Sequence, residues 1–80
     1  MSSAYTPIDC DLYERYELAI MHRETLFLRW RDADGLTHLE HLTPTDLRAR
    51  AGEEFLHART ADGGNRVLRL DAIVEVRWPA

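Results

Sequence analysis

The stretch Thr25-Leu-Phe-Leu-Arg-Trp-Arg31, followed by Asp34-Gly35, decides the fold of this chain. Along it, leucine and tryptophan alternate with phenylalanine and arginine, which is the period-two pattern of a strand with one buried face. Asp-Gly is a favoured two-residue hairpin turn, so residues 36–42 are expected to return antiparallel to the first strand. The sheet therefore begins with a β-hairpin.

Three further strands are expected downstream, at residues 54–60, 66–70 and 73–78. Because proline removes a ladder donor, Thr43-Pro-Thr-Asp46 interrupts the second strand as a bend, a bulge or a short helical turn through residues 47–50. Five short strands in so small a chain leave long edges exposed unless the sheet bends strongly. The pattern therefore favours a five-stranded Sm-like (SH3-like) β-barrel.

One helix is expected before the sheet. Pro7 keeps the preceding segment extended, Asp11 is the expected N-cap, and Glu14 completes a capping-box pattern three residues later. An apolar face then recurs at helical spacing, made by Leu12, Tyr16, Ala19 and Ile20. We expect a mostly β single domain over residues 1–80, with a helix at about 11–22 over one open end of a barrel at about 25–78.

Carboxylates gather at the start of the expected helix. Asp9, Asp11, Glu14 and Glu17 lie there against one nearby cation, Arg15. Two interpretations remain open: the acids cap the helix and favour the positive end of its dipole, or they form an acidic surface that binds a partner. Local physics favours capping, which accounts for Asp11 and Glu14 better than for Asp9 and Glu17.

Composition and charge limit the partners. Fourteen acidic residues stand against ten basic ones, all arginine, for a net charge of −4 over 80 residues. Nucleic-acid-binding domains neutralise phosphates with a basic face, so free nucleic acid is not expected as a partner and a basic protein surface is. The chain has no apolar run of the roughly 20 residues that span a bilayer, and its start does not resemble a signal peptide. A cytoplasmic protein without a membrane partner is expected.

Neither catalysis nor a cofactor is expected. The single cysteine, Cys10, lies between two aspartates, a setting unsuited to a nucleophile, and is expected to be a small packed residue. His38 and His41 would point to opposite faces of a strand, and no Cys/His spacing matches a zinc site, so no metal is expected. Trp30 and Trp78 are expected to pack in the core or at the barrel rim. The chain has no nucleophile–base set or phosphate-binding glycine loop, so we do not expect an enzyme.

Motifs along residues 5–79 resemble the Rof (YaeO) family of Rho-binding antiterminators. They are Tyr5-x-Pro7-Ile8-x-Cys10-Asp11-x-Tyr13, Glu17-Leu18-Ala19, His22, Asp34-Gly35, Asp46-Leu47, Glu54-Phe55-Leu56 and Leu68-Arg69-Leu70-Asp71-x-Ile73. The resemblance implies a non-enzymatic Sm-like protein, and we expect the chain to be monomeric when free. It further implies binding to the N-terminal OB-fold of the termination factor Rho, at the primary RNA site, which blocks RNA loading and termination. Carried over by position, the expected Rho contacts are Asp9, Asp11, Tyr13, Glu14 and Glu17, with the Tyr13 ring facing outward.

A second function is kept as an alternative. Barrels of this shape often bind RNA, and Phe27 together with arginines on several strands could form a local basic strip. These arginines are Arg29, Arg31, Arg59, Arg66, Arg69 and Arg77. Pairing of the arginines with acids across strands is the favoured interpretation. The alternative is an Sm-like module that binds RNA directly.

Overall fold

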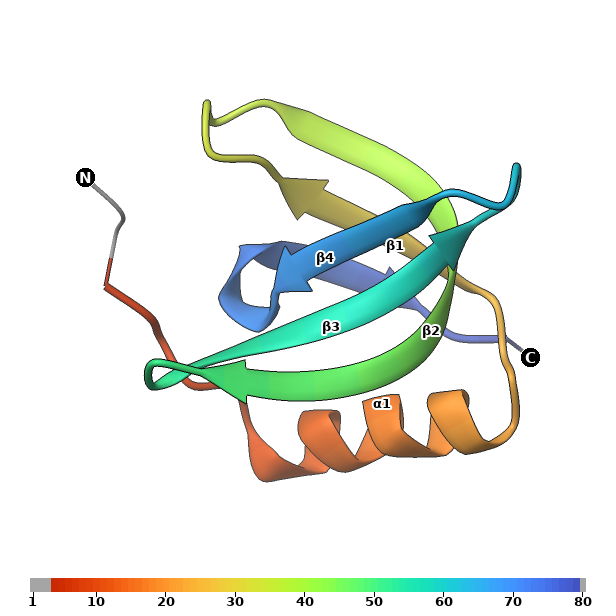
Figure 1. Ribbon diagram of the computed structural model, residues 1–80, viewed down its shortest axis with the longest axis horizontal. Coiled ribbons are helices and arrows are strands. Elements are labelled where there is room, and N and C mark those ends of the chain that lie inside the picture. Colours follow the sequence, from red (N-terminus) through yellow and green to blue (C-terminus); the bar gives the residue numbers. More distant parts are fainter. Residues whose placement is uncertain (1–3, 80) are drawn as a thin grey trace.

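The computed structural model describes residues 4–79, so residues 1–3 and 80 of the expected domain lie outside the described part. One helix precedes a five-stranded antiparallel sheet (Figure 1). The elements are α1 (Cys10–Met21), β1 (Leu26–Arg31), β2 (Thr37–Arg50), β3 (Glu53–Thr60), β4 (Asn65–Arg69), the 3₁₀ turn η1 (Leu70–Ala72) and β5 (Ile73–Arg77). The expected mostly β fold with one N-terminal helix is confirmed.

The strands are ordered β4-β3-β2-β1-β5, so the last strand pairs with the first. Consecutive strands pair through β4, and β2 curves strongly as it passes from β1 to β3 (Figure 1). This pairing makes β4 and β5 the outer strands of a curved sheet. Among residues 4–79 no pairing joins β4 to β5, so the strands form a curved sheet and not the closed barrel that was expected.

Strand β2 is longer than expected because its proline sits at a bulge. The register with β3 shifts between Pro44 and Asp46, which is one of the three alternatives expected there. The expected helical turn is wrong, since residues 47–50 pair with β3 instead. The pairing of β2 with β1 ends at Leu42, opposite Leu26, so at Pro44 no N–H is needed for a hydrogen bond to β1.

The connection between β2 and β3 is a two-residue turn that was not expected from the sequence. Both central residues have positive φ, 53° at Ala51 and 80° at Gly52. Positive φ at both positions defines the hairpin turn that matches the twist of two strands. Glycine adopts this conformation freely, whereas alanine does so at a cost. The usual sequences of such turns are Asn-Gly, Asp-Gly and Gly-Gly, so Ala51-Gly52 matches the pattern only at its second residue.

The core lies between the concave side of the sheet and α1. Tyr16 and Ala19 of α1 are buried, and they meet strand and η1 residues Leu26, Leu28, Leu42, Leu56, Ala58, Leu68 and Leu70. The expected apolar face of the helix is therefore confirmed. Trp30 and Trp78 pack against the edge of this core, as expected, with the Trp78 ring centroid 5.5 Å from that of Tyr16.

A matched pair of leucines tests this division of faces. Leu28 of β1 is fully buried, whereas Leu39 of β2 is 62% exposed. We expect Leu28→Ala to lower the free energy of unfolding by about 2–5 kcal/mol because it removes apolar contacts and leaves a cavity. Leu39→Ala is expected to change it by about 0.5 kcal/mol or less. Urea denaturation measures both, and equal losses would contradict the described core.

Candidate protein-binding surface

Helix α1 begins at Asp9, two residues before the expected cap. Asp9 has extended backbone angles (φ −60°, ψ 141°), its carboxylate accepts the Asp11 N–H at 3.3 Å, and its carbonyl accepts the Tyr13 N–H at 3.0 Å. The prediction of Asp11 as N-cap is therefore wrong, because the extended segment ends at Asp9 and the helix already includes Cys10. Capping accounts for Asp9, and Asp11 lies inside the first turn.

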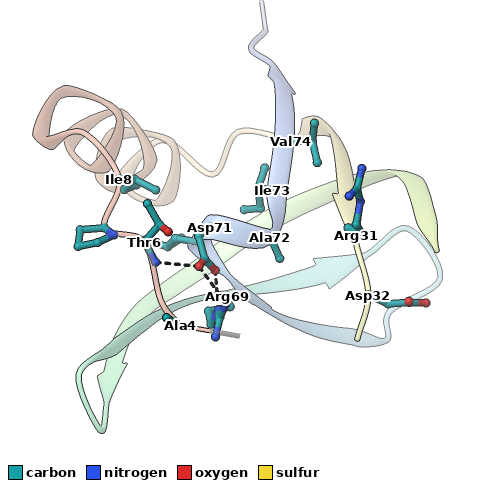
Figure 2. A pocket seen from close by; sticks show the side chains of 12 residues that line it. Ala4, Thr6, Ile8, Arg31, Asp32, Arg69, Asp71, Ala72, Ile73 and Val74 are labelled. Carbon is teal, nitrogen blue, oxygen red and sulfur yellow. Dashed lines mark hydrogen bonds and ion pairs between the residues drawn. The ribbon is translucent and has the colours of Figure 1, made fainter. Parts of the chain in front are cut away.

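The segment before α1 is held by a carboxylate at the far end of the chain. The Thr6 N–H donates to Asp71 Oδ2 at 2.9 Å (Figure 2). Arg69 contacts both oxygens of the same carboxylate, at 2.5 and 2.9 Å, and Glu53 Oε1 at 3.1 Å. Its guanidinium carbon also lies 5.7 Å from the centroid of the Tyr5 ring. Because residues 5–8 are fixed to η1 in this way, the start of α1 has a defined position on the sheet.

Four of the five expected contact residues are exposed on or just before α1. These residues, Asp9, Asp11, Glu14 and Glu17, form what we call the acidic surface. Within residues 4–79, none of their carboxylates lies within 4 Å of a cationic side chain. The one cation of this helix, Arg15, lies over the Trp78 ring, 4.7 Å from its centroid. The acidic surface therefore keeps its negative charge available to a partner.

Tyr13, the fifth expected residue, does not project freely. Its side chain is half-buried and packs against the core, so only part of the ring faces outward as expected. Burial raises the pKa of Tyr13, and the nearby charges of Glu54, Glu17 and Asp46 raise it further. The ring is therefore within range of carboxylate charges from three elements, α1, β2 and β3.

Two acids near this site, Asp46 and Glu54, were not among the expected contacts. Asp46 lies on β2 and Glu54 on β3, and the negative charge of each raises the pKa of Tyr13. The pKa of Tyr5 is raised mainly by burial and next by the charge of Glu54. The Tyr5 hydroxyl is buried and has no hydrogen-bond partner among the described residues. Both acids lie in motifs that resemble the Rof family, but their position near Tyr13 depends on the pairing of β2 with β3, which no local pattern shows.

Three of the six arginines expected to form a basic strip pair with acids of the same chain. Arg29 lies 3.6 Å from Glu75, its register partner on β5, and Arg66 holds both oxygens of Glu40 at 3.0 and 3.1 Å. The expected pairing with acids is thus confirmed for these two and for Arg69. Arg77 lies over the Phe27 ring, 6.0 Å from its centroid.

Other expectations concern cysteine, metals and membranes. Cys10 is exposed in the first turn of α1, so the prediction that it packs is wrong; the earlier helix start leaves it outside the core. In the part of the chain that the structure describes, no three His, Cys, Asp or Glu side chains are grouped so as to hold a metal ion. No helix within residues 4–79 has the length and apolar character needed to cross a membrane.

The chain matches no protein-family model. It is 37% identical over 79 residues to "Protein rof" of Escherichia coli (strain K12) and to the protein of the same name in Shigella flexneri. In each case the match covers 99% of this chain and 88% of the relative. The chain belongs to the Rof family. In this Rof family member the opening motif from Tyr5 and the late Arg69-Leu-Asp71 motif, far apart in sequence, meet at the Thr6–Asp71 hydrogen bond.

Removal of the Asp71 charge tests the contact that fixes the start of the helix. Asp71→Asn loses the two-oxygen ion pair with Arg69. The side chain of Arg69 is 17% exposed and that of Asp71 is 12% exposed. We expect a loss of about 1–3 kcal/mol in the free energy of unfolding and faster hydrogen exchange at the Thr6 amide. The matched control is Glu75→Gln, which removes an exposed partner of Arg29 and is expected to cost about 0–1 kcal/mol. Unchanged Thr6 exchange in Asp71→Asn would contradict the role of this contact.

Acid stability gives a second test of the internal ion pairs. Hydrogen bonds from Arg66 and then Trp30 lower the pKa of Glu40 from its ordinary 4.5, and His38 lowers the pKa of Asp32 from 3.8. A lowered pKa in the folded state means stability that is present above the ordinary pKa and lost as the pH falls through the folded one. We therefore expect Tm to fall steeply below about pH 4.5. The fall should be smaller in Glu40→Gln, and parallel acid profiles would contradict this role of Glu40.

Proposed function

We propose that this Rof family member inhibits Rho-dependent transcription termination. It binds the primary RNA site on the N-terminal OB-fold of Rho and blocks RNA loading, as a non-enzymatic regulator in the cytoplasm. The resemblance of its motifs to Rho-binding antiterminators supports the partner. The charge distribution supports the mode of binding, because a site that binds RNA must offer cations to phosphates and those same cations attract carboxylates.

The observation that carries the proposal is the set of unpaired carboxylates on a fixed helix. Asp11, Glu14 and Glu17 follow one another at three-residue intervals, so neighbouring carboxylates lie on adjacent parts of the helix surface. Between Asp11 and Glu17 the helix rises about 9 Å, enough to contact several cations of one groove. Asp9 extends this row at the cap, where the helix is anchored to the sheet.

Tyr13 has a supporting role in this proposal. Its half-exposed ring lies beside Glu17, where it adds an aromatic contact of the kind that RNA bases make in a single-strand site. The ring also packs against the core, so it contributes to holding this side of α1 on the domain.

Direct RNA binding receives less support. Of the arginines expected to form a basic strip, Arg29, Arg66 and Arg69 contact carboxylates of the same chain. A phosphate would have to displace these partners from a protein whose net charge is −4. Such competition opposes nucleic-acid binding at long range and at contact.

A charge reversal on α1 tests the proposed contact. We expect Asp11→Arg with Glu14→Arg to slow association with purified Rho about tenfold and to reduce its salt dependence, measured by surface plasmon resonance at several salt concentrations. The Asp9 cap is retained, so we expect the melting temperature to fall by about 5 °C or less.

The matched control reverses two exposed acids away from the helix. Asp34→Arg with Glu75→Arg changes the net charge equally, but it alters the β1–β2 turn and β5. Rho binding by this variant is expected to stay close to that of the unaltered chain. If the α1 variant melts normally and binds Rho with unaltered affinity, the acidic surface is not the contact.

A further inference from the structure

Arg15, the only cationic residue of α1, is held by a residue from the other end of the chain. Its guanidinium carbon lies 4.7 Å from the centroid of the Trp78 ring. The Trp78 ring in turn packs against Tyr16, with their centroids 5.5 Å apart and their planes inclined by 50°. The segment that follows β5 therefore returns beside the helix (Figure 1).

The helix by itself would direct Arg15 to Asp11. Long side chains on a helix lean toward its N-terminus, and residues four apart lie one above the other. Asp11 is the acid four residues before Arg15, whereas the other positions at helical spacing, 12, 18 and 19, are apolar. An acid followed four residues later by a base is the favoured order for an ion pair on a helix. Arg15 is thus placed to neutralise one of the four carboxylates of the acidic surface.

The structure shows Arg15 on the ring and not at the acid. Among the described residues, no carboxylate oxygen of Asp11 lies within 4 Å of a guanidinium nitrogen. Tryptophan is the best aromatic partner for a cation, and the contact strengthens as water is removed from it. Trp78 is half-buried against the core, whereas Arg15 and Asp11 are both exposed. An exposed pair at helical spacing favours contact only about twofold, so the ring competes well for the arginine.

These contacts give Trp78 a role beyond packing. We propose that Trp78 is a positioning residue for the acidic surface: by holding Arg15 on its ring, it keeps Asp11 free to contact the cations of Rho. The inference rests on the proposed function, because Asp11 is one of the proposed contacts. Trp78 acts through Arg15, so its effect on binding requires that arginine.

NMR of the free chain tests the position of Arg15 without Rho. In the unaltered chain we expect nuclear Overhauser contacts from the Arg15 Hδ protons to the Trp78 ring. Trp78→Leu keeps an apolar side chain against Tyr16 but removes the aromatic face, so the Arg15 contacts are expected to move to the Asp11 Hβ protons. Trp78→Phe retains a ring and should keep Arg15 beside residue 78. If Arg15 stays away from Asp11 in Trp78→Leu, the proposal is overturned.

Association with purified Rho measures the consequence. We expect Trp78→Leu to slow association about two- to threefold at low salt, because Arg15 then neutralises part of the acidic surface. Trp78→Phe should associate about as fast as the unaltered chain. The matched control is Phe27→Leu, which removes a ring that lies 6.0 Å from the guanidinium carbon of Arg77, on β1 and β5. It should leave association unchanged, and thermal melts verify that each variant folds.

A second substitution separates this role from packing. In an Arg15→Gln chain no arginine can approach Asp11, so adding Trp78→Leu should not slow association further. An equal loss with and without Arg15 would show that Trp78 acts by packing alone, which contradicts the proposal.

The charge reversal on α1 distinguishes failure of this inference from failure of the proposed function. If Trp78→Leu brings Arg15 to Asp11 without slowing association, while Asp11→Arg with Glu14→Arg does slow it, only the role of Trp78 is overturned. If neither variant changes association, the proposed function of the acidic surface is overturned as well.

Discussion

The two-oxygen contact between Arg69 and Asp71 is the interaction on which the arrangement of this protein depends. Asp71 also accepts the Thr6 N–H, so a single carboxylate joins η1 to the segment before the helix. Charged hydrogen bonds of limited exposure contribute more than surface ion pairs do. Because the segment is fixed there, Asp9 is positioned to begin α1, and Tyr16 and Ala19 enter the core. The place of the acidic surface on the sheet follows from these contacts.

The carboxylates of the chain divide into two groups with different roles. Those that pair with arginine, including Glu40, Glu53, Asp71 and Glu75, stabilise the sheet and its connections. Those of the acidic surface lie on or beside one helix and keep their charge unpaired among the described residues. This division explains how a chain with ten arginines presents an acidic face, and it is the physical basis for proposing a basic partner.

Local pattern predicted much of the fold. The alternation at residues 25–31 and the apolar spacing of Leu12, Tyr16 and Ala19 each depend on neighbours in sequence, and each was confirmed. The hairpin at Asp34-Gly35 was also confirmed, but its turn is longer than the expected two residues, because Arg31 pairs with Thr37 and the Asp32 N–H donates to the Leu36 carbonyl. The cap was misplaced because Asp9 and Asp11 are chemically equivalent, and only the extended backbone at Asp9 distinguishes them. The bulge at Pro44 was one of several alternatives, because a proline without an N–H can either end a strand or lie at a bend or bulge within it.

The site was less predictable because it is built from distant segments. The acids of α1 could be identified from their spacing, but Asp46 and Glu54 reach Tyr13 through the pairing of β2 with β3. The Ala51-Gly52 turn that sets this pairing has a weak sequence signal.

The most direct test of the central claim is titration of this protein into Rho that holds a labelled cytosine-rich RNA, with the same RNA alone as control. We expect RNA to be released from Rho as the protein is added, while the RNA alone stays unbound. Binding to the RNA alone, with the Rho complex undisturbed, would contradict it and would identify the arginines of the sheet as the working surface.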